Sequence, residues 1–355
     1  MSDLVAKRRQ KILSLFDPKG FGLEIGPSYD PFLPKSQGYR VETLDHADTE
    51  TIRKKYADNA SKIEDIDYVS DGGSIFELIG EKGRYDFIYA SHVIEHVSDF
   101  IRFIADCEAL LNDNGTLVLV VPDKRFCFDA LRPLTTTGEL LQAFHEKRKR
   151  HTPGQVFDFA SSYVKKNATT IWVDTDLDNM EIANTTDGAL SLYEQAKLEE
   201  SYIDIHAWRF TPSSFRMLVG MLRSTGFFKS GIVDVITNDS SPVYRFEFYV
   251  SLRKNAPDEN LDNLALHRSI AEELHEITPS ASVSFDTLQS QIKAARETID
   301  LLQSENAHLV AVAEKASALK NDNDELKSQI SDLYNSTSWR LSAPIRALKR
   351  GFRRV

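Results

Sequence analysis

Cysteine is scarce in this chain of 355 residues, where only Cys107 and Cys127 occur. The two are not spaced as a disulfide framework or as the cysteine ligands of a zinc site. A small buried hydrophobe is the ordinary role of a free cysteine. The sequence therefore predicts two reduced, buried thiols, no metal site and no redox chemistry.

Long apolar runs are also missing, since no stretch approaches the roughly 18 apolar residues of a membrane span. Residues 1–10 are charged and lack the apolar core of a signal peptide, which predicts a cytoplasmic protein. The formal net charge is −10, and binding to phosphates needs clustered Lys and Arg. This composition argues against a nucleic-acid partner.

Apolar residues make up 41% of the sequence, enough to bury one substantial core and leave a second element outside it. We expect the main domain over residues 1–254. A polar, proline-containing stretch predicts a linker over residues 255–287, with a short helix outside the core as the alternative. A coiled coil over residues 288–334 and a basic amphipathic tail over residues 335–355 complete the predicted organisation.

From residue 20 to residue 123, short β-rich runs alternate with amphipathic helical stretches, which is the pattern of a doubly wound α/β sheet. Five parallel strands are expected there: Phe21–Ile25, Tyr39–Leu44, Ile66–Val69, Tyr85–Ala90 and Thr116–Val121. Two later runs, Ile232–Ile236 and Tyr244–Leu252, are separated by turn-forming residues and are expected to close the sheet as an antiparallel pair. The predicted sheet is mostly parallel with an antiparallel end strand.

Residues 288–333 contain neither proline nor glycine, and their apolar residues follow a seven-residue repeat. The repeat runs through Leu288, Ala295, Leu302, Leu309, Ala316, Asn323 and Ile330. It predicts a long coiled-coil helix that pairs with another copy of the chain or with a partner. A second series at Leu319, Leu326 and Leu333 indicates a register shift. A single long helix packed on its own domain is the alternative.

Acids and glycines follow the expected strands at the edge where open α/β sheets bind ligands. The first strand delivers Glu24 and then Gly26, and a glycine lets the backbone approach a cofactor closely. No G-x-G-x-x-G occurs here, which disfavours a nicotinamide enzyme. Asp45 ends the second strand, where a carboxylate can accept hydrogen bonds from ribose hydroxyls. Asp71 and Gly72 form a turn after the third strand, and an ordinary turn is the alternative reading for them.

Residues 85–97 join an apolar strand to a helix through a polar corner that contains Ser91 and His92. In chain order, E-x-G, the strand-end Asp, the Asp-Gly turn, D-F-I-Y-A-S-H-V-I-E-H-V and N-G-T-L-V-L-V-V-P resemble the class I S-adenosylmethionine-dependent methyltransferases of the type 11/23-like kind. The resemblance covers residues 21–122, about a third of the chain. It implies a Rossmann-like fold, this cofactor and methyl transfer.

The resemblance also implies which residues contact S-adenosylmethionine: Glu24, Gly26, Asp45, Asp71, Gly72, Ser91 and His92. Glu24 and Gly26 would border the methionine and ribose portion. Asp45 would contact the ribose hydroxyls, and the turn of Asp71 and Gly72 would contact the adenine. Ser91 and His92 would lie near the sulfonium. Many family members have a second glycine where this chain has Ser28, so the loop over the methionine is expected to differ in shape.

A hydroxyl acceptor benefits from a general base, and histidine suits this task because its ordinary pKa is near neutrality. The candidates are His92, His151 and His206, of which His92 and His206 are the leading catalytic hypotheses. His206 stands out because Asp204 and Trp208 flank it just before a helix. A histidine with a purely structural role is the alternative in each case.

The last segment, residues 334–354, combines Trp, Leu, Ile and Phe with many basic residues and no acid. Such a mixture suits a membrane surface, because apolar side chains enter the interface and cations meet anionic lipid heads. Its string S-T-S-W-R-L-S-A-P-I-R resembles tails of bacterial glycosyltransferases and associated enzymes of surface-polysaccharide assembly. This implies docking to a glycosyltransferase partner or to the inner face of the cell membrane. A solvated basic tail is the alternative.

The leading functional hypothesis is O-methylation of a sugar or glycan intermediate in cell-surface polysaccharide biosynthesis. Two alternatives stay open. One is methyl transfer to a small metabolite or a lipid. The other is a catalytically inactive scaffold that gathers glycan-assembly enzymes through its coiled coil.

Overall fold

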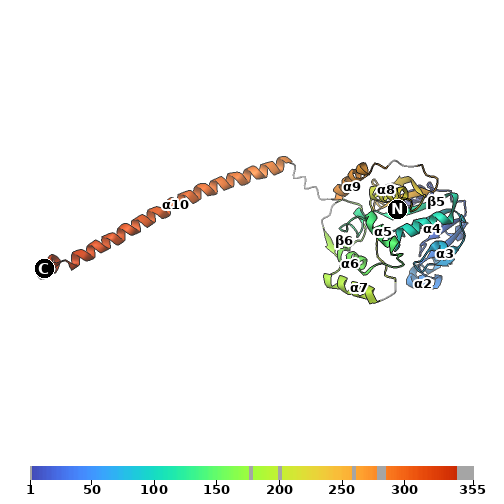
Figure 1. The fold of residues 1–355 in the computed structure, drawn as a ribbon, viewed down its shortest axis with the longest axis horizontal. Helices are drawn as coiled ribbons and strands as arrows, with labels where there is room; N and C mark the ends of the chain where they lie inside the picture. The colour runs from blue at the N-terminus through green and yellow to red at the C-terminus, as the bar shows by residue number, and fades with distance from the viewer. Residues whose placement is uncertain (1, 176–178, 199–201, 258–260, 278–284, 342–355) are drawn as a thin grey trace. The chain divides into compact units, whose positions relative to one another are not determined.

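The computed structural model describes residues 2–175, 179–198, 202–257, 261–277 and 285–341. The chain divides into two compact units, residues 1–280 and residues 281–355 (Figure 1). The first unit contains every residue predicted to bind the cofactor or to act in catalysis. The candidate site therefore belongs to one compact unit.

A seven-stranded sheet forms the centre of the first unit, within the part of the chain that the structure describes. Its strands are β1 (Gly22–Ile25), β2 (Val41–Asp45), β3 (Tyr68–Val69), β4 (Tyr85–Ser91), β5 (Leu111–Pro122), β8 (Gly231–Ile236) and β9 (Glu247–Arg253). They lie in the order β3-β2-β1-β4-β5-β9-β8. The first five strands pair in parallel, and β9 pairs antiparallel with both β5 and β8. This confirms the Rossmann-like sheet, although the antiparallel strand lies one place inside the edge rather than at it.

Both faces of the central strands are covered, which explains why β4 and β5 are apolar on both sides. One face packs mainly against α4 (Phe100–Leu110), α5 (Thr137–His145) and α8 (Pro212–Ser224) (Figure 1). The opposite face packs against α1 (Ser2–Leu13). The register between β4 and β5 jumps from Tyr85↔Leu111 to Phe87↔Thr116. Residues 112–115, which include an Asn-Gly pair of the kind common in turns, are therefore not paired with β4.

Shorter elements complete the connections in the first half of this unit: α2 (Thr49–Lys55), α3 (Ile75–Ile79), η1 (Lys35–Gln37), η2 (Ala57–Lys62) and η3 (Lys124–Phe126). Between β5 and β8 the chain adds a smaller layer. It consists of α6 (Pro153–Ser162), β6 (Val164–Lys166), β7 (Met180–Ile182) and α7 (Thr186–Leu198). The sequence predicts only helix and loop here, because each strand of the β6-β7 pair is three residues long and too short to show an alternating pattern.

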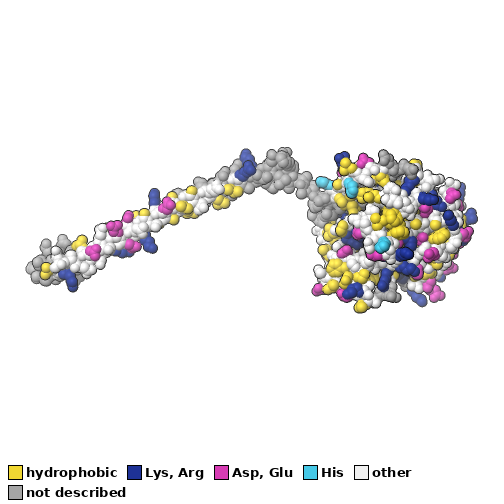
Figure 2. Space-filling model, viewed as in Figure 1, with side chains coloured by type: hydrophobic (Ala, Val, Ile, Leu, Met, Phe, Trp, Pro, Cys, Tyr) yellow, Lys and Arg dark blue, Asp and Glu magenta, His cyan; other side chains and the backbone are white. Residues whose placement is uncertain are grey.

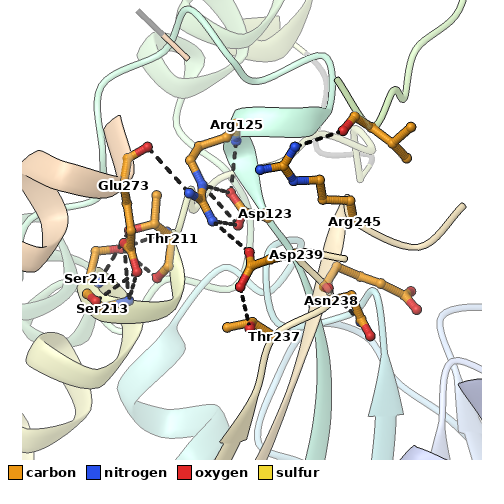
Figure 3. Close-up of polar contacts among 12 residues, drawn as sticks. Asp123, Arg125, Thr211, Ser213, Ser214, Thr237, Asn238, Asp239, Arg245 and Glu273 are labelled. Atoms are coloured by element: carbon orange, nitrogen blue, oxygen red, sulfur yellow. Dashed lines mark hydrogen bonds and ion pairs between the residues drawn. The ribbon is translucent and has the colours of Figure 1, made fainter. Parts of the chain in front are cut away.

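Helix α9 (Asn263–Ile277) lies within residues 255–287, for which the sequence predicts a linker. It packs on α8, and its Glu273 carboxylate accepts hydrogen bonds from the backbone N–H and the hydroxyl of Ser213, at 3.1 and 2.7 Å (Figure 3). Glu273 thus satisfies an N–H in the first turn of α8 that the helix itself leaves free. The contact joins residues 60 positions apart, so no local pattern announces it.

The second unit contains α10 (Phe285–Asn335) and the short α11 (Thr337–Leu341). The 51 residues of α10 correspond to a length of about 76 Å at about 1.5 Å per residue. The long C-terminal helix is thus confirmed. Its seam is exposed, as with Leu309 at 59%, Leu319 at 68% and Leu326 at 56%, and hydrophobic side chains lie along it in Figure 2. Pairing through this face stays a prediction.

The sequence makes two predictions about membranes, a basic tail that binds the membrane surface and the lack of a membrane-spanning segment. The basic tail lies largely in residues 342–355, outside the described part of the chain. Among the described residues, no helix combines the length and apolar character needed to cross a membrane.

We expect Glu273→Ala to lower the free energy of unfolding of the first unit by about 1 kcal/mol, the ordinary effect of losing a helix cap. For a domain of this size the melting temperature should fall by roughly 2–4 °C. Glu272→Ala is the matched control, because Glu272 is the exposed neighbour on the same helix. Equal melting temperatures for the two variants would contradict the capping role.

The exposed seam of α10 predicts that the full chain self-associates. Sedimentation equilibrium should show an oligomer, and Leu309→Asp should shift it toward the monomer because a charge cannot enter the apolar seam. Ala311→Asp adds the same charge two residues away, off the seam, and should leave the oligomer intact. A monomeric full chain would refute self-association.

Candidate active site

The strand order reverses between β1 and β4, so the carboxyl ends of these strands form the switch point at which open α/β sheets bind ligands. Gly26 follows β1 with a φ of +71°, and its N–H donates to the carbonyl of Leu44 at 2.8 Å. A Cβ at this position would lie 2.7 Å from Cγ2 of Val93. Glycine is required at this position for two reasons: the left-handed backbone of the turn and the close approach of Val93.

Glu24 is buried, and its two carboxylate oxygens accept hydrogen bonds from the backbone N–H groups of Phe32 and Leu33, at 2.7 and 3.0 Å. Burial raises the pKa of Glu24 to about 7, against the two N–H donors, which lower it. The side chain is committed to the loop after β1. In the structure, Glu24 therefore positions the loop after β1. The sequence predicts instead that Glu24 contacts the methionine and ribose portion of the cofactor.

Asp45 ends β2 with its side chain almost completely buried. One carboxylate oxygen accepts from the N–H of Ser28 at 3.0 Å, and the other from the N–H of His46 at 2.7 Å. The His46 ring nitrogen Nδ1 lies 2.6 Å from the second oxygen. A carboxylate has about four acceptor positions. The two N–H groups and the half-exposed His46 ring occupy three of these positions, and binding of ribose hydroxyls by Asp45 stays a prediction.

Asp71 and Gly72 form a tight turn after β3. The Asp71 side chain is 80% exposed, and one of its oxygens accepts from the N–H of Gly73 at 2.8 Å. This bond and the nearby Lys149 ammonium lower the pKa of Asp71, which keeps it ionised. Gly72 has a φ of +82°, and a Cβ there would lie 2.4 Å from the carbonyl oxygen of Lys149. An exposed carboxylate is thus presented beside β3.

Ser91 ends β4, and His92 follows with a φ of +52° and an N–H that donates to the carbonyl of Val120 at 2.9 Å. The His92 ring lies between two carboxylates, with Nε2 3.0 Å from Glu247 and Nδ1 3.5 Å from Glu95. Burial alone lowers the pKa of His92, but the carboxylates outweigh it and raise the pKa to about 9. The ring is therefore a cation at pH 7. It suits the donation of a hydrogen bond, and the predicted general-base role requires it first to lose that proton.

Sequence reasoning missed the partner of His92. Glu247 begins β9 and also accepts two hydrogen bonds from the Arg8 guanidinium of α1, at 2.6 and 3.0 Å. Burial raises the pKa of Glu247, but the His92 and Arg8 bonds outweigh burial and lower it to about 2. An acid at the head of an otherwise apolar strand is the signal that could have found this residue.

His206 is buried beside the same corner of the site. Its Nδ1 lies 2.5 Å from the Asp129 carboxylate, and its Nε2 lies 3.8 Å from Glu95. His96, which sequence reasoning also passed over, packs edge-on against the His206 ring with centroids 4.6 Å apart. The structure therefore brings His92 and His206 to one carboxylate, that of Glu95.

His151 is also buried, with its ring 5.6 Å from the ring of Tyr202. Burial lowers the pKa of His151 to about 4. Its imidazole is therefore neutral at pH 7. Of the predicted bases whose pKa shifts, His151 carries the uncharged ring that a base needs and His92 does not.

The basic residues after β5 are held in buried ion pairs. Arg125 forms hydrogen bonds through Nε and Nη2 to the Asp123 carboxylate, and Figure 3 shows the pair close to Glu273 and Asp239. Arg132 donates to Asp129 at 2.7 Å, and both are buried. These side chains shape the loop after β5 from within.

The ends of β3, β2, β1 and β4 lie next to one another, and with them Asp71, Asp45, Gly26 and Ser91. Neighbouring strands are about 4.8 Å apart, so the four ends span roughly 14 Å. Two left-handed glycine turns at this edge pack closely on Val93 and on the Lys149 backbone, and two carboxylates offer acceptors for hydroxyl and amine groups. The row fits an extended adenosyl compound, and contact of its members with that compound stays a prediction.

Comparison with known proteins gives a family. A family model described as "Methyltransferase domain" matches residues 1–181. A search of curated proteins finds no match.

Solved structures with a similar fold include three proteins that each share 11–13% identity. A Rhodobacter sphaeroides protein described as a zinc-dependent alcohol dehydrogenase has 13% identity, covers 70% of this chain and 88% of its own, and has a TM-score of 0.39. The 1,6-didemethyltoxoflavin-N1-methyltransferase of Burkholderia thailandensis has 11% identity, coverages of 71% and 78%, and a TM-score of 0.36. A Thermotoga maritima S-adenosylmethionine-dependent methyltransferase has 12% identity, covers 71% of this chain and 90% of its own, and has a TM-score of 0.31.

We expect Gly26→Ala to destabilise the fold more than Gly80→Ala. Both glycines have left-handed backbones, with φ of +71° and +76°, but a Cβ at Gly80 meets nothing within 4 Å. The difference in unfolding free energy therefore isolates the contact with Val93, and overpacking of this kind costs about 1–3 kcal/mol. Chemical denaturation measures it, and equal losses would show that the close approach is unimportant.

Proposed function

Because this chain belongs to the methyltransferase domain family and uses S-adenosylmethionine as its methyl donor, we propose that its acceptor is a hydroxyl group of a sugar or glycan intermediate in cell-surface polysaccharide assembly. The observation that carries the proposal is the row of Gly26, Asp45, Asp71 and Ser91 along adjacent strand ends, with a polar cluster beside it. The row of strand-end residues supports binding of the methyl donor, and the polar cluster supports binding of a hydroxylated acceptor.

The polar cluster is built from ionisable side chains next to the end of β4: His92, Glu95, His96, His206 and Glu247. Sugars offer several hydroxyl groups, which donate to carboxylates and accept from imidazolium. The His92 ring is about one third exposed, so a group at the mouth of the site can meet it. A lipid chain would instead need an apolar surface. The residues present therefore favour a hydroxylated molecule.

When bound, S-adenosylmethionine supplies a methyl group on a positively charged sulfur. The chain contributes alignment, which can account for much of the barrier reduction in a displacement of this kind. The Gly26 turn lets the backbone lie close to the donor, and Asp45 accepts hydrogen bonds from ribose hydroxyls. The partly exposed His92 cation adds positive charge beside the acceptor. These roles require no covalent intermediate on the protein.

A second source of support comes from the C-terminal sequence. The string that begins at Ser336 resembles tails of bacterial glycosyltransferases and associated enzymes. The exposed apolar seam of α10 is available for a second copy or for such a partner. Methylation of a small metabolite or lipid is the rival enzyme function, and an inactive scaffold is the rival of another class.

Calorimetric titration of S-adenosylmethionine into the full chain tests the donor site. We expect binding that Asp45→Asn weakens at least tenfold, about 1.4 kcal/mol, because the amide offers one acceptor oxygen in place of two. Asp113→Asn makes the same change at a fully exposed side chain and should bind normally. A folded full chain that does not bind the cofactor would leave the scaffold function in its place.

The acceptor is tested with methyl-labelled cofactor and a panel of nucleotide sugars, oligosaccharides, lipids and small metabolites. Label in the sugars alone is the result we expect. Label in lipids or metabolites alone would replace the glycan proposal with its rival.

A further inference from the structure

A group of three potential metal ligands lies behind His92: Glu95, His96 and His206. The Nε2 atoms of His96 and His206 each lie 3.8 Å from Oε1 of Glu95. This distance is too long for a hydrogen bond. It is shorter than the sum of two ordinary zinc–ligand bonds, roughly 4.1–4.3 Å. The three ligand atoms all lie within 4.8 Å of one another, so a small inward movement of the two imidazoles would let one ion reach all three residues.

The Glu95 carboxylate is what makes this arrangement unusual. The side chain is completely buried, and neither of its oxygens has a partner in hydrogen-bond geometry among the described residues, the His92 ring lying 3.5 Å away as an ion pair on one side. A buried carboxylate without hydrogen bonds is costly unless a charge compensates it, and a bound metal ion is one such compensation. An ion held by Glu95 would add the direct ligand bond that the His92 ion pair does not supply.

Both histidines have a carboxylate behind them. Oδ2 of Asp129 lies 2.5 Å from Nδ1 of His206, and Oδ1 of Asp204 lies 2.8 Å from Nδ1 of His96, the latter as an ion pair outside hydrogen-bond geometry. Each ring thus presents its Nε2 toward Glu95. Metal-binding histidines almost always have such an outer partner, which fixes the tautomer and the ring orientation. The two carboxylates give this group the outer shell of a metal site.

The backbone brings the ligands together from distant parts of the chain. Glu95 and His96 follow β4, and the N–H groups of Ala207 and Trp208 both donate to the Glu95 carbonyl oxygen, at 2.7 and 3.2 Å. Arg132 donates to the carbonyl of His206 at 2.7 Å. The position of His206 is therefore fixed before any ion binds.

We propose that Glu95, His96 and His206 bind one divalent transition-metal ion. Two imidazoles and one carboxylate suit zinc, iron, cobalt or nickel, and three protein ligands leave positions open for another molecule. The sequence predicts no metal site, because its two cysteines lack the spacing of metal ligands and because the third ligand is 110 residues from the second in the chain.

The open positions suggest what the ion does, and this step rests on the proposed function. An acceptor hydroxyl bound there would have a lower pKa, as metal-bound water has. Its oxygen would form the new bond to the methyl carbon while the sulfur–methyl bond breaks and leaves a neutral thioether. The hydroxyl proton would pass to solvent water.

The test uses the full chain without an affinity tag, stripped with a chelator and titrated with cobalt(II) chloride alone. We expect one equivalent of ion, a visible absorption band typical of coordinated cobalt, and a melting temperature that rises with cobalt. His96→Ala and His206→Ala should each weaken binding at least tenfold. His145→Ala is the control, because His145 is an exposed histidine outside the cluster.

Asp204→Asn covers the case in which a ligand variant does not fold. Asp204 is largely exposed, and loss of an outer partner should weaken binding by roughly 10–100-fold. No bound ion in the full chain, or binding unchanged in Asp204→Asn and in the folded ligand variants, would overturn the proposal. The titration contains no S-adenosylmethionine and no acceptor. A chain that binds cobalt but methylates no sugar would thus retain the metal site and lose only the acceptor role.

Discussion

Two backbone hydrogen bonds hold the candidate site together, those from Ala207 and Trp208 to the carbonyl oxygen of Glu95. They join the corner after β4 to a segment that the chain reaches only after completing the α6–α7 layer. The Trp208 indole strengthens this join through a hydrogen bond to the Val97 carbonyl at 2.7 Å. Breaking these hydrogen bonds would leave buried polar groups unpaired, at a cost of about 1–3 kcal/mol for each group. The two segments are therefore held together firmly. The placement of His206 beside Glu95 depends on it.

The strands of the sheet were predictable where burial and turns are written in neighbouring residues. Tyr85–Ala90 and Thr116–Val121 are apolar runs because both faces of β4 and β5 are covered. The β6-β7 pair was not predictable, since three residues a strand show no period. The packing of helix α9 on the domain was missed for a different reason, because Glu273 contacts Ser213, far away in the chain.

The same distinction applies to the site. Gly26, Asp45 and Asp71 could be singled out because each stands directly after an expected strand, and strand ends of a parallel sheet share one edge. Their ligand contacts still rest on resemblance to a family. The partners of His92 could not be foreseen, because Glu247 lies 155 residues away and approaches through an antiparallel strand. Charge compensation among buried groups is a property of the folded chain.

Arg8 of α1 bonds to Glu247, 239 residues later. At about 5–20 residues per second, a ribosome needs roughly 12–48 s to make the intervening chain. During that interval α1 has no β9 to contact, and the ring of His92 lacks its buried acid. The site is therefore completed late in synthesis, when the last strand of the sheet enters between β5 and β8. The ion pairs that Arg8 and His92 make with Glu247 therefore exist only in chains whose synthesis has passed that strand.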